Sequence, residues 1–143
     1  MKRILTIAIL LAGITLASCK KDEVVSSDVA FMAMLSGAEE VPAVTTTATG
    51  MLDGVFNKDT KIFTYTLTFS GMTPTAWHIH KAAKGANGGV IFDLGKTYTT
   101  SFKGTTAALT TDQETDLMAG NYYVNFHSAK SASGEVRGQL LKR

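Results

Sequence analysis

The chain has 143 residues and a formal net charge of +2, and the whole excess comes from Lys2 and Arg3. The remaining 12 basic and 12 acidic side chains balance, so no basic surface is expected and no nucleic-acid partner is predicted. With 45% apolar and 18% charged residues, the composition excludes a disordered chain and favours one globular domain.

The N-terminus has the layout of a secretory signal. A basic start is followed by an apolar run over residues 4–16, which is too short for a comfortable permanent membrane span. Leu16-Ala17-Ser18-Cys19 then resembles the lipobox of bacterial lipoproteins, in which the cysteine receives a diacylglycerol and becomes the new N-terminus. Residues 1–18 are therefore predicted to be a lipoprotein signal peptide. The alternative is a chance cysteine after an ordinary signal.

Lipidation of Cys19 implies a membrane partner, because two or three acyl chains, such as palmitate, anchor a protein stably. Lys20 follows the cysteine where an Asp would indicate retention in the inner membrane, so the outer membrane is expected. Whether the domain faces the periplasm or the cell surface stays open. Residues 19–28 are predicted to form the lipidated cysteine and its polar tether, and residues 29–143 the domain. Cys19 is the only cysteine, so an intrachain disulfide is excluded.

The domain has the pattern of an all-β protein. Residues 61–69 alternate aromatic or apolar side chains with threonines, which is typical of a half-buried antiparallel strand. One short helix is predicted over residues 111–119, with Thr111 and Glu114 as its capping box. An antiparallel β-sandwich or barrel is expected. The other predicted strands are residues 29–35, 48–56, 76–80, 90–92, 97–103, 105–109, 121–127 and 135–141.

In three of these strands, residues 76–80, 121–127 and 135–141, apolar side chains point to one face and polar side chains to the other. In residues 76–80, Trp77 and Ile79 point to one face, and two histidines point to the other. If these strands lie in one sheet, polar residues gather on its outer surface, and the loop of residues 81–89 could cover them. These polar residues are His78, His80, Asn125, His127, Glu135 and Arg137.

Two interpretations of this polar face remain open. His78, His80 and His127 could supply three imidazole nitrogens to a copper or zinc ion, which are metals that imidazole suits. Alternatively, the histidines and Asn125 could hydrogen-bond the backbone of the covering loop, and Glu135 and Arg137 could form a cross-face ion pair. The structural interpretation is preferred, because three histidines alone do not define a metal site.

Other chemistry is poorly supported by the sequence. Glu39 and Glu40 are candidates for extra metal ligands, although a charged turn is usually only solvated. The chain has no Gly-x-Ser-x-Gly motif, and Ser128 points away from His127 on the same strand, so nucleophilic hydrolysis is not expected. We therefore predict that the protein is not an enzyme.

Four sequence motifs, in the order in which they occur in the family, resemble the CHRD domain. This module is named for repeats in chordin and is found singly in bacterial secreted proteins. The resemblance spans residues 30–141 and implies an immunoglobulin-like, all-β fold, but no enzymatic activity and no particular ligand. The motifs are Leu35-Ser36-Gly37-Ala38-Glu39-Glu40-Val41-Pro42, Ala76-Trp77-His78-Ile79-His80, Gly120-Asn121-Tyr122-Tyr123-Val124-Asn125-Phe126-His127-Ser128 and Gly134-Glu135-Val136-Arg137-Gly138-Gln139-Leu140.

A weaker likeness is to copper–zinc superoxide dismutase, a β-sandwich enzyme with a His-x-His strand and a late histidine at its copper. His78, His80 and His127 are similar to three copper ligands by pattern. The further histidines and the Asp of the bridged metal pair have no counterpart here, so the likeness implies at most a mononuclear site.

Two functional hypotheses follow. The preferred one is a lipid-anchored, non-enzymatic binding or scaffold module of the cell envelope, with a protein or polymer ligand that the sequence does not identify. The second is a histidine-based copper or zinc protein, with a redox or metal-carrier role.

Overall fold

The computed structural model describes residues 26–143 of the chain. The predicted signal peptide, Cys19 and most of the predicted tether lie outside these residues. The described elements are β1 (Asp28–Ser36), the 3-10 helix η1 (Gly37–Glu39), β2 (Thr49–Asn57), β3 (Ile62–Ser70), β4 (Pro74–Lys81), β5 (Val90–Asp93), β6 (Phe102–Thr105), α1 (Thr111–Met118), β7 (Tyr122–Ser128) and β8 (Val136–Lys142).

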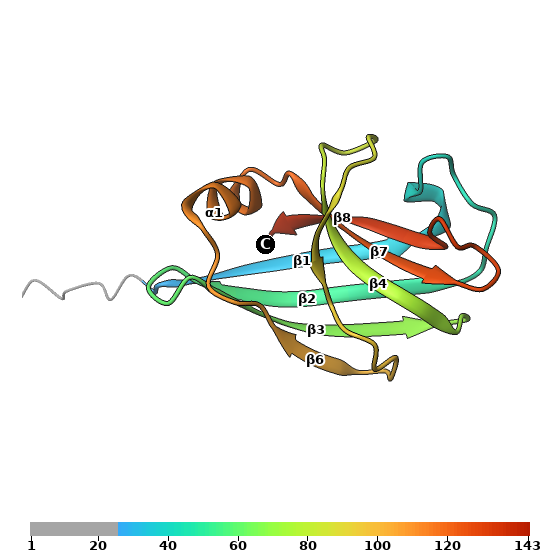
Figure 1. The fold of residues 1–143 in the computed structure, drawn as a ribbon, viewed down its shortest axis with the longest axis horizontal. Coiled ribbons are helices and arrows are strands. Elements are labelled where there is room, and N and C mark those ends of the chain that lie inside the picture. Colours follow the sequence, from blue (N-terminus) through green and yellow to red (C-terminus); the bar gives the residue numbers. More distant parts are fainter. Residues whose placement is uncertain (1–25) are drawn as a thin grey trace, which may run out of the picture.

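Eight strands form a single sheet in the order β5-β4-β7-β8-β1-β2-β3-β6. Every neighbouring pair is antiparallel, and β1, β2 and β3 pair over nine residues each without a register shift. The sheet is strongly curled, and β4 runs diagonally to β1, β2 and β3 (Figure 1). The prediction of an all-β antiparallel fold with one short helix is confirmed, in the form of one curled sheet.

Trp77 lies in the core, between strands that are near opposite edges of the curled sheet. Its ring is fully buried and packs on Phe102 of β6, with ring centroids 5.3 Å apart, and on Phe126 of β7, at 5.4 Å. Since β4 and β6 lie near opposite edges of the sheet, this contact requires the sheet to wrap around the indole. The indole Nε1 also donates a hydrogen bond to the carbonyl of Leu94 at 3.2 Å.

The strands predicted over residues 97–103 and 105–109 are wrong, apart from the short β6. The chain here crosses from β5 at one edge of the sheet to β6 at the other. On the way it places Tyr98 edge-on against Trp77, with centroids 5.1 Å apart, and buries Leu109. Packing of Tyr98 on Trp77 and burial of Leu109 take the place of strand pairing in these parts of the segment.

The helix begins at Thr111, as predicted, but its capping box lies one residue earlier than predicted. Thr110, not Thr111, is the N-cap, and its hydroxyl accepts a hydrogen bond from the backbone N–H of Gln113. The Gln113 side chain completes the box by accepting from the N–H of Thr110 at 2.9 Å. Glu114 instead reaches Lys61 at 2.8 Å, and this ion pair ties the helix to the start of β3.

All of the described elements and the core that they bury lie within residues 26–143. A chain that begins at residue 20 therefore keeps every described contact, and it is the form used in the experiments below. Among residues 26–143 there is no helix with the length and apolar character needed to cross a membrane.

Candidate metal centre

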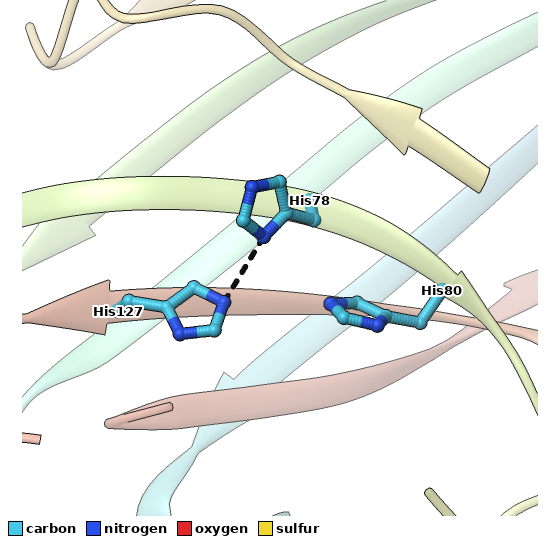
Figure 2. A group of neighbouring side chains, drawn as sticks. All are labelled: His78, His80 and His127. Atoms are coloured by element: carbon cyan, nitrogen blue, oxygen red, sulfur yellow. Dashed lines mark hydrogen bonds between the residues drawn. The ribbon is translucent and has the colours of Figure 1, made fainter. Parts of the chain in front are cut away.

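The fold brings the three histidines together. His78 and His80 come from β4 and His127 from the adjacent β7, and the rings gather on one side of these strands (Figure 2). Each histidine offers one ring nitrogen, and the three nitrogens all lie within 4.8 Å of one another. Nitrogens bound to one ion at about 2.0–2.1 Å stand about 3.3–3.6 Å apart, so ring movements of about 1 Å would close the cluster on a metal.

Backbone carbonyls determine the tautomers of two rings. The Nδ1 of His80 lies 3.0 Å from the carbonyl oxygen of Gly88, and the Nδ1 of His127 lies 2.9 Å from that of Ala132. Because a carbonyl only accepts, the hydrogen-bond pattern assigns the proton to Nδ1 in both rings and leaves a lone pair on each Nε2. This is the arrangement that orients metal-binding histidines in known sites.

The two free lone pairs have different surroundings. The Nε2 of His127 lies 3.1 Å from the Nδ1 of His78, so these two rings hydrogen-bond each other (Figure 2). The Nε2 of His80 is buried and has no hydrogen-bond partner among the described residues. A buried imidazole nitrogen without a partner is costly to the fold, and a metal ion is one group that would satisfy it.

The environment favours neutral imidazoles. Burial lowers the pKa of His78, and the positive charge that His127 can carry lowers it further, whereas Asp93 opposes this. Burial also lowers the pKa of His80, against the hydrogen bond to Gly88. Both rings therefore stay longer in the unprotonated form that binds metal as the pH falls.

His80 is held in place by aromatic stacking. Its ring lies parallel to that of Tyr123, with an interplanar angle of 7° and centroids 4.8 Å apart. The guanidinium of Arg137 lies over the same tyrosine ring, 3.5 Å from its centroid. Because β7 lies between β4 and β8, the imidazole and the guanidinium approach Tyr123 from opposite sides. The stack fixes the orientation of His80.

The prediction that these six polar residues lie on an outer surface is wrong for three of them. Asn125, Glu135 and Arg137 are buried, with Arg137 only 2% exposed. The loop of residues 81–89 covers the face, as expected, because Arg137 donates to the carbonyl of Ala86 at 2.7 Å and to the Asn87 side chain at 2.9 Å. Strand alternation assigned the face, and the sequence suggested the covering loop, but neither predicted the burial of Arg137.

The predicted ion pair between Glu135 and Arg137 is also wrong, since none of the ion pairs within residues 26–143 joins them. Glu135 instead accepts a hydrogen bond from the hydroxyl of Thr46 at 2.7 Å. Hydrogen bonds from Ser128 and then Thr46 lower the pKa of the Glu135 carboxyl. The loop that precedes β2 thus supplies the partner, which strand periodicity does not reveal.

The two glutamates of the 39–40 turn have different environments, and the structure does not bring either into the histidine cluster. Glu39 is half-buried and forms an ion pair with Lys84 at 3.2 Å, which ties the covering loop to this turn. Glu40 is only 9% exposed and accepts a hydrogen bond from the side-chain nitrogen of Asn125 at 2.5 Å. Burial raises the pKa of Glu40 to about 7, although the nearby charge of Arg137 opposes the shift.

The raised pKa of Glu40 predicts a pH-dependent stability. Between about pH 4.5 and pH 7 the folded chain binds more protons at this site than the unfolded chain, so the free energy of unfolding falls as the pH rises. Glu40→Gln removes the buried charge and is expected to stabilise the fold by about 1–2 kcal/mol above pH 7. This gain is smaller than the full pKa shift implies, because solvent near Glu40 screens part of the charge. Urea unfolding at pH 5 and pH 8 checks this. A variant with the same advantage at both pH values would contradict it.

A pocket of about 430 Å³ opens beside the cluster and reaches His80 and Asn125. Glu40 and Gly134 also line it, and a Cβ at Gly134 would lie 2.3 Å from the Asn125 side-chain nitrogen. A side chain at position 134 would therefore displace Asn125. Of the three cluster histidines, His80 is the one that lines this pocket.

Sequence reasoning did not predict the roles of two contributors to the site. The alternation along β7 placed Tyr123 on the same face as Asn125 and His127, but its stacking on His80 was not predicted. Asn87 bridges Arg137 and the carbonyl of Val41 through its side chain, a role that its place in the predicted loop of residues 81–89 did not indicate.

Comparison with known proteins gives one match. A family model described as CHRD domain matches residues 31–140, which is most of the chain. No curated protein and no solved structure matches significantly.

Proposed function

Because the match covers most of its length, the chain belongs to the CHRD-domain family, and we propose that it is a non-enzymatic binding module of the bacterial cell envelope, anchored by lipid on Cys19. Three features support this: the lipobox-like Leu16-Ala17-Ser18-Cys19, the polar residues that follow it, and the start of β1 at Asp28. A tether of residues 19–27 would hold the domain close to the membrane surface.

The anchoring is tested by replacing the cysteine. Cys19→Ser removes the thiol that would accept the lipid, so we expect the protein to lose incorporation of radiolabelled palmitate and to leave the detergent phase in Triton X-114 partition. Cys19→Ala should behave in the same way. Unchanged partition and labelling in both variants would contradict lipidation at this residue.

The binding function that the geometry supports best is coordination of one copper or zinc ion by His78, His80 and His127. The single observation that carries it is the approach of three imidazole nitrogens to within 4.8 Å, two of them with lone pairs left by Nδ1–carbonyl hydrogen bonds. Imidazole suits both metals, and three such ligands with an open position form a common metal site.

Metal content tests this function. Residues 20–143 should be purified without a histidine tag and titrated with Cu²⁺ and Zn²⁺ by calorimetry at pH 7.5, followed by elemental analysis of the dialysed protein. One ion per chain is expected, and a variant with all three histidines replaced by alanine should bind none. No stoichiometric binding by the wild-type chain would exclude the function.

A further inference from the structure

We propose that the side-chain oxygen of Asn125 is the fourth donor atom of the metal centre, and that Glu40 is the residue that positions it. This inference rests on the proposed function, since it extends the donor set of the same ion.

Asn125 occupies the middle of the polar face. In the sheet it pairs with His78 of β4 on one side and with Arg137 of β8 on the other. Directly paired side chains on one face lie about 4.5–5.5 Å apart at Cβ, and neighbours two residues along a strand lie about 7 Å apart. Tyr123 and His127 are those neighbours on β7. Asn125 therefore lies beneath the rings that surround the candidate ion.

The amide of Asn125 is oriented by Glu40. The Oε1 of Glu40 lies 2.5 Å from the Nδ2 of Asn125, and a carboxylate only accepts hydrogen bonds, so the NH₂ group faces Glu40. The oxygen Oδ1 is then turned away from the carboxylate. It is buried and has no hydrogen-bond partner among the described residues.

Two residues of the polar face thus each have a buried polar atom without a hydrogen-bond partner. The Nε2 of His80 and the Oδ1 of Asn125 both carry lone pairs, and both residues line the same pocket. Leaving two such acceptors unsatisfied in the interior is costly, and one cation bound between them would satisfy both. Amide oxygens also serve as weak axial ligands in some copper sites.

The surrounding charges are compatible with a neutral oxygen donor. Arg137 brings a buried positive charge into this face, but its guanidinium is directed to Ala86, Asn87 and the ring of Tyr123. A donor set of three imidazoles and one amide carries no charge of its own. The carboxylate of Glu40 contributes its charge from behind Asn125, where it offsets part of the charge of the ion.

The test compares Asn125→Ala with the wild-type chain, both as residues 20–143 loaded with Cu²⁺ or Zn²⁺ at pH 8. We expect a loss of affinity of about 10–100-fold and, in X-ray absorption spectra, the loss of one oxygen scatterer while three imidazoles remain. Thr75→Ala is the matched control, because Thr75 is an exposed residue of β4 outside the proposed site, and its affinity should equal that of the wild type.

Two further variants allow the test to be made even if Asn125→Ala does not fold. Glu40→Gln combined with Asn125→Asp exchanges donor and acceptor, so an oxygen still faces the ion, and affinity should be retained or increased. Glu40→Ala releases the amide and should weaken binding several-fold. Equal affinity and identical spectra for the wild type, Asn125→Ala and Glu40→Ala would overturn this inference and leave the three-histidine site intact. Absence of metal in the wild type would overturn both.

Discussion

Replacing His80 by alanine is expected to lower the affinity for Cu²⁺ or Zn²⁺ by about 100-fold or more. Its Nε2 is the one cluster nitrogen that is buried and makes no hydrogen bond, so it has no interaction to lose when a metal binds. Its ring is already held by Gly88 and Tyr123, which reduces the entropy lost on coordination.

Calorimetric titration of residues 20–143 measures this effect. Thr75→Ala is the matched control, because Thr75 is an exposed residue of the same strand, and its affinity should equal that of the wild type. Binding should also weaken in every variant as the pH falls, since protons compete for the imidazoles. An affinity for His80→Ala within threefold of the wild-type value would remove His80 from the site.

Trp77→Ala should lower the free energy of unfolding by about 3–5 kcal/mol. The indole is fully buried and contacts β6 and β7, so its removal leaves a cavity between β4 and these two strands. The hydrogen bond from Nε1 to Leu94 is lost as well. The expected loss is a large part of the total stability of a domain of this size.

Urea unfolding followed by circular dichroism measures the loss. Trp77→Phe keeps an aromatic ring and should lose less, because only part of the volume and the hydrogen bond are removed. A cost below 1 kcal/mol for Trp77→Ala would mean that the sheet does not depend on this contact.

Much of the fold was predictable from local alternation. In β3 and β7 the backbone imposes a period of two, so the positions of Phe63 and Val124 in the core follow from the sequence alone. The same rule placed His78, His80 and His127 on a common face, and the register of β4 with β7 brings them together.

The parts that were not predicted depend on contacts distant in sequence. Arg137 is buried because Ala86 and Asn87, about 50 residues earlier, fold over it. Glu40 lies 85 positions from Asn125, and no periodicity connects them. The same limit applies to residues 97–103, where packing of Tyr98 on Trp77 replaced strand pairing.

The most direct measurement of the three-histidine site is a crystal structure of residues 20–143 grown with one equivalent of zinc, with diffraction recorded on both sides of the zinc absorption edge. We expect a single anomalous peak within about 2.0–2.1 Å of one ring nitrogen from each of His78, His80 and His127. Full-occupancy zinc bound elsewhere on the chain, with these three rings still hydrogen-bonded as in the unloaded protein, would contradict it.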